Sequence, residues 1–411
     1  MPSTNRKRSV FDLTCELPLF RYTYICRCWQ VAVKMLSYGS MREGWKTPFA
    51  NGGDFQGNNK RETKGQHEMK MRFKGVLFAA VAAMGLTAMA DGVVKRFDSH
   101  VEGGAGDGSS WANAYTSIAD AIAAVAEAGG GEVWVKQGTH TFAQGTGFSL
   151  RSGVTVLGGF KGEDGTDDAV RDPAEYVTTL AGVNNNNEND RIISQAVACD
   201  NTAVLDGVTL TQSRYAYRAV TANARPLFRN CLFSGKAGIC SRSGDGATGS
   251  SADFVGCRFV NLSGGSGYGL INIEGVNASV TFTDCVISDT TALGKFGIVT
   301  ANGGVSFTRC QFLRNTTAAT GNQAALICRY DWGDVDFVDC KLLWNTVPCD
   351  TGIATFRRMT NCLIASNTVA SATATAGRTA LLCAGSSPVL LYRCSIFDNS
   401  VDRKCGLLNA P

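Results

Sequence analysis

Histidine and proline are scarce in this chain of 411 residues, with three and eight copies, and only His100 and His140 lie beyond residue 90. Residues 91–411 contain no Cys-x-x-Cys pair. Structural zinc sites commonly use such thiolate pairs, and a Ser–His–Asp triad needs a suitably placed histidine. The sequence therefore argues against a zinc site and against a histidine-based nucleophilic triad.

A basic region is also missing from most of the chain. The formal net charge is +4, but residues 91–411 hold 25 basic and 29 acidic residues. A protein that binds nucleic acid usually presents a clustered basic face. We therefore expect no nucleic acid among the partners.

The longest apolar run has the layout of a secretory signal peptide. Residues 69–90 begin with three basic residues, continue with an apolar stretch of about a dozen residues and end on Ala88-x-Ala90. A short buried helix or a membrane anchor is the alternative, but the stretch is shorter than the roughly 18–20 residues of a membrane span. We predict cleavage near Ala90 and a secreted, periplasmic or outer-surface location.

The residues before this segment show no repeat and no steady periodicity. A signal peptide begins at the N-terminus of a chain, yet residues 1–68 precede it here. We interpret residues 1–68 as the result of a start codon assigned too early, with Met69 or Met71 as the true first residue. An extended, disordered signal region is the alternative.

One motif recurs seven times: an aromatic or aliphatic residue, two small or polar residues, a cysteine and a further apolar residue. Its cysteines are 26, 28, 25, 30, 22 and 32 residues apart: Cys231, Cys257, Cys285, Cys310, Cys340, Cys362 and Cys394. The aromatic position includes Phe254, Phe282, Phe307 and Phe337. Self-similarity at a period of about 27 residues indicates a solenoid.

Each repeat predicts three short strands. Val280-Thr281-Phe282 shows the period-two alternation of a half-buried strand. The aromatic residue and the cysteine are three positions apart, so a bend must lie between them before a second strand. A third apolar element recurs, as at 237–240 and 324–328. The pattern predicts an all-β fold, a right-handed three-sided parallel β-helix, over residues 131–411.

Four asparagines stand five residues past the cysteines of the last four repeats: Asn315, Asn345, Asn367 and Asn399. Neighbouring coils of a β-helix lie about 4.8 Å apart, so equivalent residues stack. An asparagine at a turn tolerates the left-handed conformation and bonds to the backbone and to its neighbours. We interpret the four as a structural ladder.

The repeated cysteines favour packing over disulfides. Residues 91–411 hold an odd number of cysteines, and the repeated ones fall at strand positions. Stacked cysteines would place their Cβ atoms about 4.8 Å apart, whereas a disulfide prefers about 3.8 Å. We interpret them as an inward ladder of buried thiols. One or two incidental disulfides involving Cys199, Cys349 or Cys405 are the alternative.

A helix is predicted in the N-terminal segment, residues 91–130. Ser117 and Asp120 have the spacing of a capping box, and apolar residues at 118, 122 and 125 form one stripe. The open end of a β-solenoid exposes an apolar core and unpaired backbone, so it needs a cover. We predict that this helix covers that end, ahead of a first strand at 132–136.

Several segments, in this order, resemble one group of exported proteins: Asp107–Ala114, Val133–Thr139, Gly158–Glu163, Thr179–Gly182 and Leu205–Leu210. They are similar to the N-terminal part of right-handed parallel β-helix proteins of the polymorphic outer-membrane-protein kind, within the pectate-lyase-like superfamily. The tetrad Phe312–Asn315 resembles their Phe-x-x-Asn unit. The resemblance implies a surface-exposed β-helix, and several proteins of that kind are adhesins.

One acidic stretch is a candidate for chemistry. Arg329, Asp331, Asp334 and Asp336 combine three carboxylates with one basic residue, as β-helix enzymes that act on acidic polysaccharides do. Calcium needs six to eight oxygen ligands, which this stretch does not supply, so we assign no cofactor and no metal. The alternative is a solvated loop, and the acidic run 163–168 is interpreted as a surface loop by the same reasoning.

Two classes of function remain. The first is an exported noncatalytic β-helix protein of the cell surface or envelope, an adhesin-like passenger or an interaction module for host or envelope glycans or proteins. The second is a polysaccharide lyase or glycoside hydrolase, which should show convergent carboxylates and basic residues on adjacent coils. The regular ladders favour the first. Because residues 405–411 stop part-way into a coil, we expect a truncated reading frame or self-association at that end.

Overall fold

The structure is a computed structural model that describes residues 92–221, 223–241, 250–263, 270–273, 277–292, 297–317, 326–329, 333–347, 352–369, 380–384, 389–401 and 406–409. The N-terminal extension, the signal peptide, Asp331, Cys349 and Cys405 lie outside these residues, so the predictions made for them stay predictions. One α-helix, α3 (Ile118–Glu127), and one 3₁₀ turn, η1 (Gly165–Asp167), accompany the strands of the described part. No helix among these residues is long and apolar enough to cross a membrane.

The strands form four sheets. Sheet A consists of β1 (Val93–Phe97), β2 (Gly131–Lys136), β4 (Val154–Phe160), β7 (Val204–Asp206), β10 (Leu227–Arg229), β13 (Ala252–Val255), β16 (Ser279–Thr283), β20 (Gly304–Thr308), β24 (Val335–Val338), β28 (Arg358–Thr360) and β32 (Leu390–Tyr392). Sheet B consists of β3 (Gly138–Thr141), β5 (Thr178–Ala181), β8 (Thr209–Thr211), β11 (Leu232–Ser234), β14 (Arg258–Val260), β17 (Val286–Ser288), β21 (Gln311–Leu313), β25 (Lys341–Leu343), β29 (Leu363–Ala365) and β33 (Ser395–Phe397).

Sheet C consists of β6 (Arg191–Gln195), β9 (Ser213–Ala219), β12 (Ala237–Ser241), β15 (Ile271–Ile273), β19 (Val299–Ala301), β23 (Ile327–Arg329), β27 (Ala354–Phe356), β31 (Ala380–Ala384) and β35 (Gly406–Asn409). A short sheet D consists of β18 (Thr291–Ala292), β22 (Thr316–Thr317), β26 (Thr346–Val347), β30 (Thr368–Val369) and β34 (Ser400–Val401).

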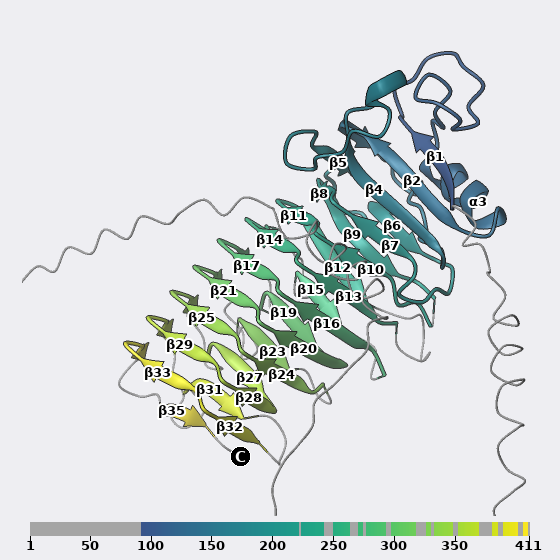
Figure 1. Ribbon diagram of the computed structural model, residues 1–411. Coiled ribbons are helices and arrows are strands. Elements are labelled where there is room, and N and C mark those ends of the chain that lie inside the picture. Colours follow the sequence, from purple (N-terminus) through teal and green to yellow (C-terminus); the bar gives the residue numbers. More distant parts are fainter. Residues whose placement is uncertain are drawn as a thin grey trace, which may run out of the picture. The chain divides into compact units, whose positions relative to one another are not determined.

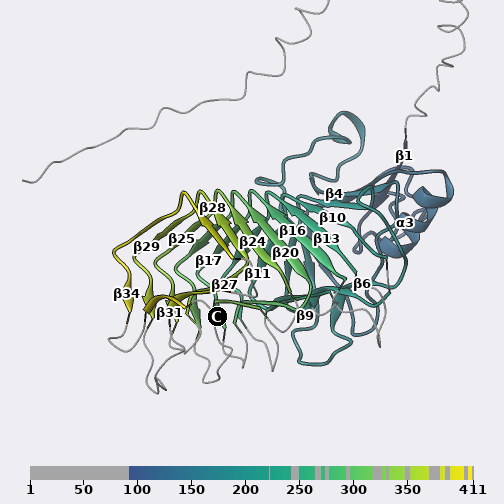
Figure 2. The same ribbon diagram turned by 90° about the horizontal axis from the view of Figure 1, so that it is seen from below.

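From β4 onward, each coil passes through sheets A, B and C in turn, as β20, β21 and β23 do. Strands of successive coils lie side by side and pair in parallel, for example β16 with β20 (Figures 1 and 2). The predicted all-β, right-handed three-sided parallel β-helix is therefore confirmed. Sheet D was not predicted; its two-residue strands come between sheets B and C in the chain.

Phenylalanine rings stack along the inside of sheet A. Phe254, Phe282, Phe307 and Phe337 share one register position on successive strands, and Phe228 in β10 extends the column. Neighbouring ring centroids lie 4.9–5.1 Å apart, with interplanar angles of 20° or less. The rings are completely buried, so this column removes a large apolar area from water in every coil that it crosses.

Left-handed residues make the corner between sheets A and B. The seven bend positions have φ values between 53° and 64°: Asn230, Gly256, Asp284, Arg309, Asp339, Asn361 and Arg393. This bend lets the aromatic residue and the cysteine, three positions apart, both point inward. Arginine rarely adopts this conformation, so its presence at two of the positions indicates that stacking between coils, and not residue type alone, imposes the bend.

The repeated cysteines follow this corner, and their side chains lie inside the coil. Cys257 Sγ lies 3.4 Å from the carbonyl oxygen of Phe228 in the preceding coil, and Cys310 Sγ lies 3.3 Å from that of Phe282. Burial raises the pKa of the Cys257 thiol well above its ordinary value. Cys199 and all seven repeated cysteines are thiols in the structure. The repeated cysteines thus form a ladder in which packing and weak S–H···O contacts join the coils.

The four asparagines form a second ladder at the corner after sheet B. Asn345 Nδ2 donates to the carbonyl oxygen of Phe312 (3.0 Å) and to Oδ1 of Asn367 (2.9 Å). Its own Oδ1 accepts from the backbone N–H and from Nδ2 of Asn315, both at 3.0 Å. The left-handed conformation that we expected of the asparagines belongs instead to the residue before each one: Arg314, Trp344, Ser366 and Asp398. That residue makes the turn, and the amide is free to point inward.

Helix α3 covers the N-terminal end of the coils, as predicted. Ser117 Oγ accepts a hydrogen bond from the backbone N–H of Asp120, which caps the first turn. The buried stripe packs against β1, β2 and β4 and consists of Ile118, Ala121, Ile122 and Val125. Strand β1 was not predicted. It precedes the helix and pairs in parallel with β2, so sheet A begins within the N-terminal segment.

Replacing Asn345 by alanine should destabilise the protein by more than about 2 kcal/mol, because several buried donors and acceptors lose their partner at once. Chemical unfolding of the variant and of wild type measures the difference. Asn186→Ala, an exposed asparagine in a loop, is the matched control and should change stability by less than about 0.5 kcal/mol. Equal effects of the two substitutions would contradict a structural role for the ladder.

Candidate functional site

The acidic stretch proposed for chemistry lies on the outer face of sheet A. Asp336 alternates with the buried Val335 and Phe337 in β24 and therefore points outward, and Asp334 directly precedes the strand. Asp331 lies outside the described residues, as does the side chain of Arg329 at the end of β23. The structure therefore places two of the four candidate residues.

Two arginines of the next coil hold these carboxylates. Arg357 Nη2 and Arg358 Nη2 lie 2.6 and 2.7 Å from Oδ2 of Asp336, and Arg357 Nε donates to Oδ1 at 3.1 Å. Arg357 Nη1 also lies 2.9 Å from Asp334 Oδ2. Two carboxylates and two guanidinium groups thus form one electrically balanced cluster, which we call the Asp336 cluster.

Asp336 stays ionised in this cluster. Asp336 is only 7% exposed, and burial alone would raise the pKa of its carboxyl group. Hydrogen bonds and positive charges from Arg357 and Arg358 outweigh burial, so the pKa is lowered. A carboxyl group that acts as a general acid near neutral pH needs a raised pKa. Asp336 therefore has the properties of a structural ion-pair partner.

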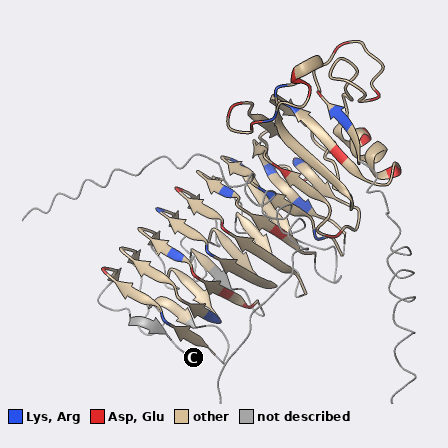
Figure 3. Cartoon of the chain, viewed as in Figure 1, with Lys and Arg blue, Asp and Glu red and all other residues tan. Residues whose placement is uncertain are grey.

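Similar contacts join other coils from the outside. Asp253 in β13 accepts from Arg225 Nε at 2.8 Å and from the hydroxyl of Thr281, one coil further on, at 2.6 Å. Corner residues of successive coils also form ion pairs: Asp284 with Arg309 and Asp289 with Arg314. Figure 3 shows both signs of charge spread over the coils. Among the described residues, these pairs of opposite charge connect neighbouring coils.

Hydroxyl groups occupy the outer face of sheet A between Asp253 and Asp336. Strands β16 and β20 lie between the strands that carry the two aspartates. We call their four half-buried outward side chains the hydroxyl strip: Thr281, Thr283, Ser306 and Thr308. The strip presents donors and acceptors at coil spacing, with an ion-paired carboxylate on either side.

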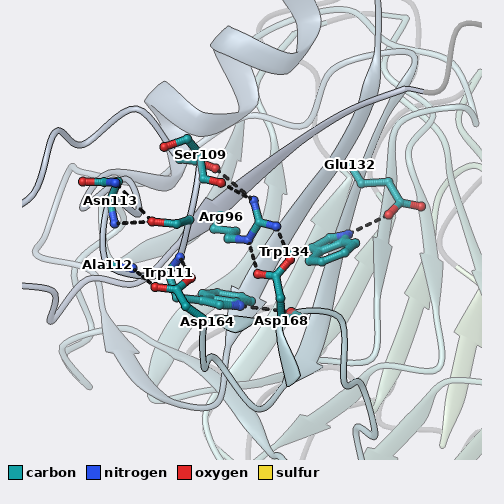
Figure 4. Close-up of polar contacts among 11 residues, drawn as sticks. Arg96, Ser109, Trp111, Ala112, Asn113, Glu132, Trp134, Asp164 and Asp168 are labelled. Atoms are coloured by element: carbon teal, nitrogen blue, oxygen red, sulfur yellow. Dashed lines mark hydrogen bonds and ion pairs between the residues drawn. The ribbon is translucent and has the colours of Figure 1, made fainter. Parts of the chain in front are cut away.

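The acidic run 163–168 anchors the N-terminal segment (Figure 4). Asp168 forms an ion pair through two hydrogen bonds with Arg96 of β1. Asp164 accepts from the backbone N–H of Trp111 at 2.7 Å and from that of the following residue at 3.0 Å. The guanidinium of Arg96 lies 6.0 and 5.2 Å from the rings of Trp111 and Trp134. The run is a surface loop, as predicted, but its carboxylates also fix a distant part of the chain, which was not predicted.

The two histidines beyond residue 90, His100 just after β1 and His140 in β3, lie together. The ring centroids of His100 and His140 are 5.5 Å apart. Ser99 Oγ lies 2.7 Å from Nδ1 of His140 and 3.2 Å from Nδ1 of His100. Asp98 Oδ1 lies 3.5 Å from Nδ1 of His100. We call these four residues the histidine cluster.

Hydrogen bonds fix the orientation of the buried histidine. His140 Nε2 lies 3.0 Å from the carbonyl oxygen of Lys136, and the residue is 1% exposed. A carbonyl only accepts, so Nε2 carries the proton and Nδ1 is the acceptor that faces Ser99. Burial lowers the pKa of His140, which keeps the ring neutral near neutral pH. Lys136 Nζ also lies 2.9 Å from Asp98 Oδ2.

A cleft of about 210 Å³ adjoins the histidine cluster. Its lining includes Ser99, His140, Phe142 and the start of α3 at 117–119. The cleft therefore borders the half-buried Ser99 and the buried His140, and His100 is itself exposed.

No spacing pattern in the sequence predicts this cluster. His100 and His140 are 40 positions apart, and neither belongs to a short ligand motif. They meet because β1 pairs with β2, and β3 follows β2 after one residue. We argued against a histidine site because histidine is scarce. The fold nevertheless brings these two histidine rings together.

Comparison with known proteins finds similarity only at the level of folds. No protein family matches the sequence, and no curated protein does. A surface adhesin of Streptococcus pneumoniae is 12% identical, with a TM-score of 0.32 over 71% of this chain and 89% of the adhesin. A tailspike protein of Acinetobacter baumannii bacteriophage Fri1, a capsular polysaccharide depolymerase, is 14% identical, with a TM-score of 0.38 over 77% of this chain and 62% of the tailspike protein.

The A-module of a mannuronan C-5 epimerase from Azotobacter vinelandii is 12% identical, with a TM-score of 0.30 over 72% of this chain and 94% of that module. At such low identities and scores these similarities carry no conclusion about function. The assignment of the fold rests on the strand pairing described above.

Asp336→Asn should destabilise the protein at pH 7 by about 1–2 kcal/mol, since the partly exposed arginines lose a charged partner. The pKa of Asp336 is lowered in the folded state, so its stabilising contribution exists above the unfolded pKa of about 3.9 and is lost as pH falls through the folded value. Unfolding of variant and wild type at pH 7 and pH 3 should show the difference shrinking at pH 3. Asp284→Asn, at an exposed pair, is the control and should cost little at pH 7. A pH-independent effect of Asp336→Asn would contradict the ion-pair role.

Proposed function

We propose that this chain is an exported, noncatalytic β-helix protein of the cell surface or envelope, an adhesin-like interaction module of the kind that polymorphic outer-membrane proteins exemplify. Its ligands are glycans or proteins of the host or envelope, and it acts after cleavage of a signal peptide near Ala90. The observation that carries this proposal is the Asp336 cluster, in which arginines of the next coil bind the carboxylates of Asp334 and Asp336.

The charges in that cluster favour a structural role. A polysaccharide-cleaving enzyme needs a group that releases a proton to the substrate or accepts one from it. Asp336 has a lowered pKa and so is not a proton donor near neutral pH, and its two oxygens together contact three guanidinium nitrogens. Those contacts would have to break before Asp336 could accept a proton from a substrate.

The hydroxyl strip supports an interaction role for the same face. Its four side chains are small and half-buried, so they leave the outer surface of β16 and β20 accessible to an extended ligand. Hydroxyl groups donate and accept hydrogen bonds, which suits the hydroxyl-rich surface of a glycan. The strip lies on regular strands of a rigid scaffold, and the contacts it offers are therefore pre-organised.

A specific observation also favours the enzymatic alternative. Carboxylates and basic residues do converge on adjacent coils at one face, through Asp334, Asp336, Arg357 and Arg358, as a polysaccharide lyase or glycoside hydrolase of this fold requires. An arginine near a carboxylate could also bind an acidic sugar. Substitutions in the Asp336 cluster can therefore distinguish the two functions by experiment.

The decisive assay incubates the full-length protein with acidic and neutral polysaccharides and measures new reducing ends and unsaturated products. We expect no cleavage above the level of heat-denatured protein. Cleavage by wild type that disappears in Asp334→Asn/Asp336→Asn, with the folded state intact by circular dichroism, would establish the enzymatic alternative. Asp284→Asn serves as the control for a lost outer-face ion pair elsewhere.

Binding is tested with a panel of immobilised glycans and cell-envelope proteins. Ser306→Lys places a long charged side chain in the hydroxyl strip and should lower binding at least about tenfold. Gln311→Lys makes the same addition on the outer face of sheet B in the same coil and should leave binding unchanged. Equal binding by wild type and both variants would refute the hydroxyl strip as the interaction surface.

A further inference from the structure

The histidine cluster contains the donor set of a transition-metal site. One ligand atom each from Asp98, His100 and His140 lies within 4.8 Å of the other two. Two imidazoles and one carboxylate are a common ligand set for zinc and for other first-row divalent ions. We propose that Asp98, His100 and His140 bind a divalent transition-metal ion, with zinc as the defining probe, beside the cleft under α3.

The distances suit this assignment. Bonds of about 2.0–2.1 Å to a tetrahedral zinc ion place the ligand atoms roughly 3.3–3.5 Å from one another. Asp98 Oδ1 and His100 Nδ1 already lie 3.5 Å apart. The other ligand atoms lie within 4.8 Å of one another, so closing the triangle requires a shift of about 1.5 Å or less, which His100 can supply because its side chain is 65% exposed.

His140 is oriented as a metal ligand would be. Metal-binding histidines almost always donate the ring N–H that does not face the metal to a carbonyl or carboxylate. Here Nε2 donates to the carbonyl oxygen of Lys136, which leaves Nδ1 as the ligand atom, on the side of Ser99 and within 4.8 Å of the ligand atoms of His100 and Asp98. The ring is buried against Phe97, with centroids 4.9 Å apart, so this orientation is held by packing as well.

Ser99 marks the point at which the two rings converge. Its hydroxyl oxygen lies within hydrogen-bond distance of Nδ1 in both histidines. Nδ1 of His140 also accepts from the backbone N–H of Ser99 at 3.4 Å, so Ser99 contacts both rings and holds His140 from two directions. A cation bound there would take the lone pairs of both nitrogens in place of these hydrogen bonds, and the oxygen of Ser99 or a water molecule from the cleft would complete its coordination.

Lys136 tunes the charge of the site. Its ammonium group lies 2.9 Å from the second oxygen of Asp98, and the buried carboxylate is 4% exposed. In the absence of metal this ammonium balances the carboxylate charge. With metal present it opposes a second positive charge nearby, so Lys136 should weaken metal affinity. Replacing Lys136 should therefore raise the metal affinity of the site, whereas replacing one of the ligands should lower it.

The test is zinc titration of the full-length, tag-free, reduced protein by calorimetry. Loss of an outer-shell partner typically costs 10–100-fold in affinity, so His100→Ala, which removes a direct ligand, should cost at least about tenfold. Lys136→Met should raise affinity. His67→Ala removes the third histidine of the chain, which lies outside the described residues, and should leave affinity unchanged.

Cobalt substitution separates this site from the many thiols. Co²⁺ bound by imidazole and carboxylate should give visible bands without the thiolate charge-transfer absorption that cysteine ligands produce, and His100→Ala should abolish them. His100 is exposed, so the variant should keep the metal-free unfolding temperature of wild type. Equal zinc affinity of wild type and His100→Ala, or a cobalt spectrum dominated by thiolate absorption, would overturn the proposal.

Discussion

The whole structure depends on parallel coils stacked in register at the spacing of a β-sheet, about 4.8 Å. Each inward side chain must therefore pack against the equivalent side chain of the coil before it and of the coil after it. Phenylalanine meets this condition by offset stacking, cysteine by packing and S–H···O contacts, and asparagine by amide-to-amide hydrogen bonds. The left-handed corners follow from the same requirement, because only a bend at that position turns both the aromatic residue and the cysteine inward.

On the outside, stacking brings together residues that no local motif connects. Asp336 meets Arg358 because the two share a register position on adjacent strands, and Asp253 meets Thr281 for the same reason. The arginine contacts neutralise Asp334 and Asp336, which in the sequence alone belong to an acidic stretch with a catalytic appearance. The histidine cluster arises in the same way at the other end of the fold, where β1 enters sheet A beside β2.

Much of the fold was predictable because its determinants are periodic. The cysteine repeat, the bend positions and the capping helix at Ser117 are local patterns that the structure reproduces. The predictions from sequence were incomplete or wrong where partners are distant. β1 lacks a repeat signature, the left-handed residue precedes each ladder asparagine, and the acidic run 163–168 anchors Arg96 and the backbone of Trp111.

The sequence by itself determined the architecture, since every coil repeats the same inward residues and any other register would bury polar groups against apolar ones. Only the tertiary structure decided which polar groups have partners. It paired Asp336 with arginines of the next coil, and it brought His140 within reach of His100 and Asp98. The physical reason is that inward positions are specified by burial, which a residue's type reveals. Outer contacts depend on which coil lies alongside, and residue type alone does not encode that.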